Sequence, residues 1–243
     1  MNTNRPTATL VGVMFILASA TAILGFLFYQ PILIDPDYLA NGAENSTQVV
    51  LGALMELALV VTAIGTAIGL FPILRPYGER IALGHLCFRF LEAVVISVGI
   101  VAVLSLLTLS KDFVAADAAN TSAYHVSGTL LQAVYKTTSM LGPLFLLGIN
   151  TLMYSYLLFK SKLVPRPLAV MGLTGATLVL VYAMLVLFGV VVHGSGPATI
   201  LALPVALYEM FLAVWLIVKG FNPSAVAFDS AKQPLSSPLL NVA

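Results

Sequence analysis

Charge is scarce in this chain of 243 residues, of which 9% are charged and 60% are hydrophobic. A typical soluble domain is about 25% charged. Ten acidic and eleven basic residues cannot cover the surface of a soluble fold of this length, and a formal net charge of +1 provides no basic face for a polyanion. The composition therefore excludes a soluble globular enzyme, a disordered chain and a nucleic-acid-binding protein. It predicts a membrane protein whose main partner is the lipid bilayer.

Cysteine is equally scarce, because Cys87 is the only one in the chain. A single cysteine forms no intrachain disulfide, and cysteine-rich zinc and iron–sulfur sites are excluded. Cys87 lies inside an apolar run, where we expect it to be a small buried hydrophobic side chain.

Common catalytic and cofactor motifs are also lacking. The sequence contains no Walker loop, no glycine-rich dinucleotide fingerprint after a strand, no HExxH and no Gly-x-Ser-x-Gly elbow. We therefore expect no cofactor and no metal. His125 and His193 could ligate a metal together with Glu56 or Glu209, but no short-range spacing supports such a site.

Six apolar runs are long enough to cross a bilayer, which requires about 20 residues. The predicted fold is an all-α, polytopic bundle of six transmembrane helices, at about residues 7–29, 49–74, 81–109, 129–159, 168–192 and 199–219. The third and fourth runs exceed the bilayer thickness, so we expect them to tilt or to project beyond it. Proline- and glycine-containing polar stretches separate the runs, and the longest predicted loop is Lys111 to Gly128. The six helices form one domain, residues 1–221, followed by a flexible cytoplasmic tail, residues 222–243.

The first run has an alternative interpretation as a cleaved signal peptide. It begins near Arg5 and contains the small residues Ala18, Ser19 and Ala20. Because the apolar stretch continues to Tyr29, an uncleaved span is favoured. Cleavage would leave five helices.

Basic residues predict the orientation, because they are enriched in cytoplasmic segments. With both termini in the cytoplasm, the outer loops hold only Lys111. The inner segments then hold eight bases: Arg5, Arg75, Arg80, Lys160, Lys162, Arg166, Lys219 and Lys232.

Five charged residues lie within the apolar runs: Glu56, Arg89, Glu92, Lys136 and Glu209. A charge of this kind costs about 2.5–3.5 kcal/mol at the centre of a membrane helix, so each must face the bundle interior, a wet cavity or another charge. Measured from the ends of their runs, Glu56, Lys136 and Glu209 descend from the outer side. Arg89 rises from the inner side, and Glu92 lies near the midplane.

Polar residues form two helical stripes with spacings of three and four residues. The stripes are His85, Arg89 and Glu92 on the third span, and Gln132, Lys136 and Ser139 on the fourth. We expect the two stripes to face each other, with Arg89 paired to Glu92 or to a partner across the interface. His85 is expected to be exposed at the inner headgroup level. Three glutamates against two bases leave one carboxylate in excess, which is a candidate proton carrier.

Small residues and prolines within the spans indicate close packing and kinks. Gly65 and Gly69 permit the close approach of a partner helix, which leaves a homo-oligomer open without specifying one. Pro143 and Pro204 can kink their helices and free carbonyl groups to line a cavity.

Several short motifs together resemble the DUF4386 family of uncharacterised bacterial membrane proteins. They are the span that begins at Arg5, Pro36-Asp37-Tyr38-Leu39, Phe88-Arg89-Phe90-Leu91-Glu92, Pro165-Arg166-Pro167-Leu168-Ala169, and the stretch from Glu209 through Trp215-Leu216 to Lys219-Gly220-Phe221. The resemblance implies a prokaryotic inner-membrane protein of about six helices. It implies no activity, so no catalytic residue is transferred.

The intramembrane charges lead to three functional hypotheses. The first is the binding or translocation of a small solute or proton through a polar cavity. Its candidate residues are Glu56, Arg89, Glu92, Lys136 and Glu209, with His85 and Gln132 beside them; Arg89 and Lys136 would attract an anionic group. The second is a non-transporting sensory or scaffolding module whose charges specify packing. The third is an intramembrane lipid-modifying enzyme with a glutamate as general acid or base. The favoured hypothesis is not enzymatic.

Overall fold

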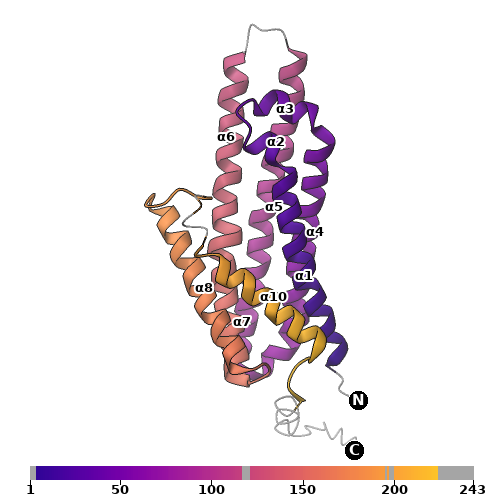
Figure 1. The fold of residues 1–243 in the computed structure, drawn as a ribbon, viewed down its shortest axis with the longest axis vertical. Helices are drawn as coiled ribbons and strands as arrows, with labels where there is room; N and C mark the ends of the chain where they lie inside the picture. The colour runs from indigo at the N-terminus through magenta and orange to yellow at the C-terminus, as the bar shows by residue number, and fades with distance from the viewer. Residues whose placement is uncertain (1–3, 117–120, 195, 197–199, 224–243) are drawn as a thin grey trace, which may run out of the picture.

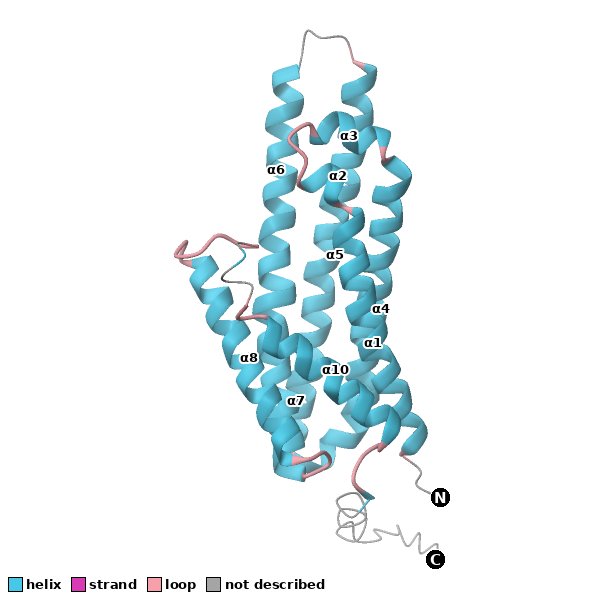
Figure 2. Cartoon of the chain, viewed as in Figure 1, coloured by secondary structure: helices cyan, strands magenta, loops and turns pink. Residues whose placement is uncertain are grey.

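The computed structural model describes residues 4–116, 121–194, 196 and 200–223, and within these ranges the chain is helical and contains no strand (Figures 1 and 2). The principal helices are α1 (Arg5–Phe28), α2 (Gln30–Leu33), α3 (Tyr38–Glu44), α4 (Ser46–Leu74), α5 (Glu79–Ala115), α6 (Thr121–Met140), α7 (Leu147–Ser161), α8 (Arg166–Leu187) and α10 (Leu203–Val218). A 3-10 turn, Arg75–Tyr77, follows α4, and a π-helical segment, Leu141–Leu146, joins α6 to α7. The predicted tail lies, from residue 224 on, outside the described residues, as does residue 199, where the sixth predicted span begins.

Five helical segments are long and apolar enough to cross a membrane, which indicates a multi-pass membrane protein. They are Arg5–Phe28, Ser46–Tyr77, Glu79–Ala115, Thr121–Ser161 and Arg166–Leu187. The sixth predicted span is the shorter helix α10, whose 16 residues extend about 24 Å at 1.5 Å per residue. Pro204 lies in the first turn of α10 and does not kink it, because proline is readily accommodated at a helix start.

The third and fourth predicted spans are overlong, as expected. Of the loop predicted from Lys111 to Gly128, residues 117–120 lie outside the described residues, and the prediction is wrong on both sides of them. Helix α5 has 37 residues and continues to Ala115, and α6 begins at Thr121. The ring centroid of Phe113 lies 5.7 Å from the ring centroid of Tyr124 and 5.7 Å from that of His125. These contacts hold α5 and α6 together beyond the expected bilayer boundary. The Tyr38 hydroxyl at the start of α3 donates to the His125 carbonyl, which ties α3 to α6.

The helices pack as neighbours along much of the chain, and α10 closes the arrangement. Helix α1 lies along α4, α4 along α5, and α5 along α6, while α10 crosses obliquely between α1 and α8 (Figure 1). A Cβ atom at Gly65 or Gly69 would come within 2.5 Å of Met14 or Val11 of α1. The close approach of helices predicted from these two glycines is therefore confirmed.

The outward surfaces of the long helices are apolar, as a bilayer requires. Ile23 is 62% exposed, Val61 67% and Val101 64%. Cys87 is also exposed, so the prediction that it is buried is wrong. It lies two residues from both His85 and Arg89, which places it about 200° around the helix from the buried polar stripe.

Basic residues collect at one end of the molecule. Arg5 donates to the carbonyl groups of Ile217 and Val218 at 3.0 and 2.8 Å, and Lys160 donates to the Tyr77 carbonyl at 2.8 Å. These contacts place the start of α1 with the ends of α10, α4 and α7, as Figure 1 also shows. The described segments that hold Arg5, Arg75 and Lys160, which the sequence assigned to the same side of the membrane, therefore lie at the same end of the fold.

Candidate functional site

A cavity of about 370 Å³ lies among α1, α4, α5, α6 and α10, and four of the five intramembrane charges line it. Glu56 comes from α4, Arg89 and Glu92 from α5, and Glu209 from α10. The remaining wall is mostly apolar and aromatic, with α1 contributing the side chains of Ala22, Ile23 and Phe26. The helices thus bring together charges that lie as far apart as residues 56 and 209 in the sequence.

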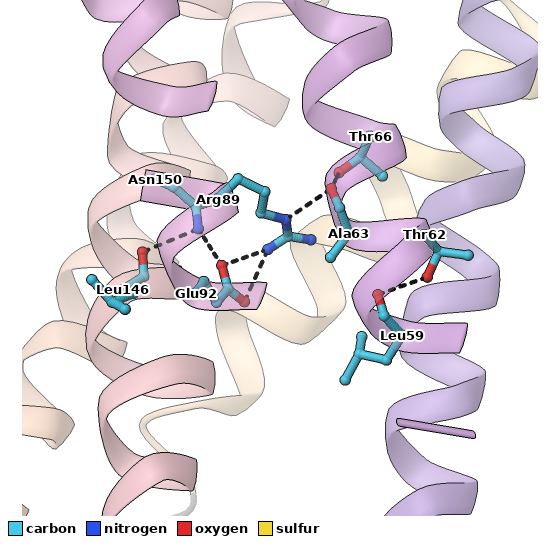
Figure 3. Close-up of polar contacts among 8 residues, drawn as sticks. All are labelled: Leu59, Thr62, Ala63, Thr66, Arg89, Glu92, Leu146 and Asn150. Carbon is cyan, nitrogen blue, oxygen red and sulfur yellow. Dashed lines mark hydrogen bonds and ion pairs between the residues drawn. The ribbon is translucent and has the colours of Figure 1, made fainter. Parts of the chain in front are cut away.

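Arg89 and Glu92 form a buried ion pair that has further hydrogen bonds to α4 and α7 (Figure 3). Both residues are 4% exposed, and Nη1 of Arg89 lies 3.0 and 3.2 Å from the two carboxylate oxygens of Glu92. Nε of Arg89 donates to the Ala63 carbonyl of α4 at 3.3 Å. The structure therefore contains the ion pair along α5 that the spacing of Arg89 and Glu92 allowed. The hydrogen bond from Arg89 to Ala63 also joins α5 to α4.

Asn150 completes this network from α7. Its amide nitrogen donates to Oε2 of Glu92 and, at 3.0 Å, to the Leu146 carbonyl. Asn150 is fully buried, so it adds a third helix to the ion pair. Sequence reasoning missed it, although an asparagine inside an apolar run was a usable signal.

Glu56 is the second carboxylate of the cavity, and only one of its oxygens has a hydrogen bond. The side chain is 9% exposed, and the Tyr135 hydroxyl donates to Oε1 at 3.1 Å. Within the described part of the chain, Oε2 is buried and has no hydrogen bond of ordinary geometry. Tyr29 lies beside the same carboxylate, and its ring meets the Tyr135 ring edge-on at 5.7 Å.

Glu209 is the third carboxylate, and its Oε1 has no hydrogen-bond partner among the described residues although this atom is buried. The residue as a whole is half-buried. It lies within electrostatic reach of both Arg89 and Glu92, which places it at the same end of the cavity as the ion pair. Glu56 is seven residues from Ala63 along α4, so the Tyr135 end of the cavity lies about 10 Å away along that helix.

Three predicted site residues, Lys136, Gln132 and His85, are not among the residues that line the cavity. Lys136 is exposed on α6, whereas its neighbours Tyr135 and Ser139 line the cavity. Residues 135 and 139 share a helix face, and residue 136 is rotated from Tyr135 by about 100°. The expectation that Lys136 faces the bundle interior is therefore wrong, and its long side chain can extend toward a membrane surface.

Gln132 and His85 have structural contacts. The Gln132 amide donates to the Ile32 carbonyl at 3.1 Å and so joins α6 to α2. His85 is 1% exposed and packs edge-on against Tyr154 at 5.1 Å between ring centroids. The prediction that His85 is exposed is wrong, because α7 and its tyrosine cover this face of α5.

Ser139 and His193 form a hydroxyl–imidazole pair at the cavity wall, at 3.3 Å between Oγ and Nε2. Oγ of Ser139 also lies 2.9 Å from the Lys136 carbonyl, so its proton has two acceptors within reach, and the donor in the pair depends on the tautomer of His193. Burial lowers the pKa of His193, which favours the neutral ring. Nδ1 of His193 is buried without a hydrogen-bond partner among the described residues, so the third group that orients a catalytic base is lacking there.

A π-helical segment forms another part of the wall. Pro143 and Leu144 of Leu141–Leu146 line the cavity. Proline lacks an N–H group, so the regular hydrogen-bond ladder is interrupted here, and the wider turn takes up the interruption. The expectation that Pro143 perturbs its helix beside a cavity is confirmed. No three His, Cys, Asp or Glu side chains in the described ranges are placed to hold a metal ion.

Comparison with known proteins gives one match. The model of a family described as a domain of unknown function, DUF4386, matches residues 10–220, which include every residue that lines the cavity. No curated protein and no solved structure matches the chain.

Proposed function

From the premise that this chain belongs to the DUF4386 family, we propose that it binds a small solute, and exchanges protons with it, in the cavity inside the bilayer. One observation carries the proposal. Glu56 and Glu209 line the same cavity, and each has a buried oxygen without a hydrogen bond of ordinary geometry among the described residues.

Buried polar atoms in proteins are normally hydrogen-bonded, because an unsatisfied one costs about 1–3 kcal/mol. A group retained at this cost in a cavity is available to a ligand or to a proton. Arg89 differs from these two glutamates, because its charge is already paired with Glu92 and its Nε donates to the Ala63 carbonyl. The residues proposed to exchange protons are therefore Glu56 and Glu209.

Reconstitution into liposomes tests the proposal directly. We expect the protein to move a member of a panel of small solutes across the bilayer, at a rate that depends on an imposed pH gradient. Glu56→Gln and Glu209→Gln should lower the rate, whereas Glu44→Gln, which removes an exposed carboxylate of α3, should leave it unchanged. Absence of flux and of solute binding in folded protein would overturn the proposal.

A scaffolding role is the second candidate, and the Arg89 network favours it. The ion pair and Asn150 join α4, α5 and α7, so these charges fix helix positions whatever else the protein does. A purely scaffolding protein would show no binding at the cavity, and Glu209→Gln would then have no effect beyond folding. A lipid-modifying activity has less support, because no described residue hydrogen-bonds to Nδ1 of His193 to orient it as a base for Ser139.

We also propose that α10 makes a sixth crossing and that the basic end faces the cytoplasm of a prokaryotic cell. The supporting observation is that Arg5, Lys160 and Arg75 lie at one end, while Lys111 is near the far end of α5. Single cysteines at positions 160 and 111, in a Cys87→Ser background, test this. An impermeant maleimide added to intact cells should label position 111 and not position 160, and the reverse result would overturn the orientation.

A further inference from the structure

We infer that the ligand of the cavity is an amphipathic organic cation that enters from the bilayer, between α1 and α6. The inference rests on the proposed function and names its ligand class. It differs from the expectation based on sequence, in which Arg89 and Lys136 would attract an anion.

The first argument for a cationic ligand is the charge balance within the cavity. Three carboxylates line it, those of Glu56, Glu92 and Glu209, and Arg89 is the only basic side chain among the described lining residues. Lys136 faces outward, and burial lowers the pKa of the lining His193, which disfavours its charged form. The ionised cavity therefore has an excess of two negative charges, which a cation would reduce.

Hydrogen bonding carries the second step. The charge of Arg89 is already paired, because Nη1 contacts Glu92 and Nε donates to the Ala63 carbonyl. Two carboxylate oxygens of the lining residues are buried without a hydrogen bond of ordinary geometry among the described residues: Oε2 of Glu56, on a side chain that is 9% exposed, and Oε1 of Glu209. Two unsatisfied buried acceptors complement a positively charged group and do not complement a negative one.

Aromatic side chains add to this preference. Phe26 and Tyr135 line the cavity at the Glu56 end. The faces of aromatic rings attract cations, and this attraction strengthens where water is excluded. An alkylammonium head group therefore has both a carboxylate and ring faces available at this end.

The position of the opening indicates an amphipathic ligand. Ile23 and Phe26 line the cavity, yet they are 62% and 51% exposed. Both lie inside the membrane-spanning helix α1, so the cavity reaches the flank of the bundle. Figure 1 shows α1 and α6 on either side of α5 at this level. A ligand that arrives through this opening comes from the hydrocarbon region and needs an apolar body.

Three probes that share an octyl chain separate charge from hydrophobicity: octyltrimethylammonium, octyl sulfate and 1-octanol. Their binding is measured by equilibrium dialysis against the protein in phosphatidylcholine nanodiscs, with empty nanodiscs subtracted. We expect saturable binding of octyltrimethylammonium that is about tenfold or more tighter than that of either other probe. Acidification should weaken the binding of the cation and leave that of octanol unchanged, because protons compete for the same carboxylates.

Substitutions locate the binding in the cavity. Glu209→Gln and Glu56→Gln should each weaken cation binding severalfold, and the double variant should bind the cation no better than octanol. Glu44→Gln is the matched control and should bind as the parent protein does. Glu209→Asp keeps the charge and should retain most of the binding, which separates loss of charge from loss of fold. Thermal unfolding of each variant checks that it is folded.

The outcomes distinguish this inference from the proposed function. Equal binding of the three probes, or a preference for octyl sulfate, would overturn the cationic ligand class while flux of another solute still supported the proposed function. Preference for the cation that persists in the double variant would place the binding elsewhere and would also overturn the inference. The comparison of probes on the parent protein stands even if a variant fails to fold.

Discussion

Glu92 and Glu209 line the same cavity, yet their surroundings differ in almost every respect. Glu92 accepts hydrogen bonds from Arg89 and from Asn150, and its residue is 4% exposed on the longest helix of the fold. Glu209 lies half-buried on the short helix α10, and its Oε1 has no partner among the described residues. A satisfied carboxylate fixes the packing of its neighbours, and an unsatisfied one is free to meet a ligand. Residue type and depth alone do not distinguish these two roles.

Breaking the ion pair between Arg89 and Glu92 should have the largest effect on stability. Arg89→Leu leaves the Glu92 carboxylate buried without its charge partner, and removal of one member of a buried pair costs about 3–5 kcal/mol. We expect a large fall in the midpoint of thermal unfolding in detergent. The double variant Arg89→Leu/Glu92→Leu should recover much of the loss, because no lone charge remains.

The exposed ion pair of Arg75 and Glu79 is the matched control. Its atoms lie 2.8 Å apart, but both side chains are more than half exposed. Exposed pairs contribute about 0–1 kcal/mol, so Arg75→Leu should change the unfolding midpoint little. Equal effects of Arg75→Leu and Arg89→Leu would contradict the role given to the buried network.

Asn150→Ala should have the next largest effect. The substitution removes the hydrogen bond to Glu92 and the bond to the Leu146 carbonyl, and a lost hydrogen bond to a buried charged group costs about 1.5–3 kcal/mol. The same measurement of thermal unfolding applies, with Asn45→Ala in the half-buried turn before α4 as the comparison. If the Arg89→Leu background abolishes the effect of Asn150→Ala, the two residues belong to one network; strict additivity would show that they do not.

Tyr135→Phe tests the intermediate case of Glu56, which has one hydrogen-bonded oxygen. The substitution keeps the ring that meets Tyr29 and removes the donor to Oε1. We expect a loss of about 1 kcal/mol in stability, smaller than at Asn150. Tyr124→Phe, which keeps the ring contact with Phe113, is the control and should be near neutral.

Local patterns in the sequence predicted much of the helical framework. The run from residue 49 to 74 lies within α4, and the spacing of Arg89 and Glu92 predicted a contact that the structure contains. Both depend on helix periodicity, which is local. The loop from Lys111 to Gly128 was mispredicted because contacts such as Phe113 with Tyr124 cross between helices.

The make-up of the cavity depends on rotations of one helix against another, which one sequence does not determine. The charge of Lys136 and its depth suggested an inward position, but Tyr135 and Ser139 face the cavity instead. His85 shares its stripe with Arg89, yet Tyr154 of α7 covers it. Removing Lys136 from the interior raises the excess of carboxylates over bases from one to two, which is why we infer a cationic ligand in place of the anion expected from the sequence.

Glu209→Gln should have the smallest effect on stability and the clearest effect on binding. Gln keeps the shape of the side chain, and no hydrogen bond to Oε1 is lost within the described residues, so we expect the free energy of unfolding to change by less than about 0.5 kcal/mol or to rise. Glu92→Gln is the paired substitution, because the same change of charge there weakens the contact with Arg89. Thermal unfolding and the binding of octyltrimethylammonium are measured on both variants. Glu92→Gln should lower the free energy of unfolding more than Glu209→Gln does. Glu209→Gln should show the larger loss of binding for each unit of stability that it loses. If both variants lose stability and binding in the same proportion, the two carboxylates have the same role and the contrast between them fails.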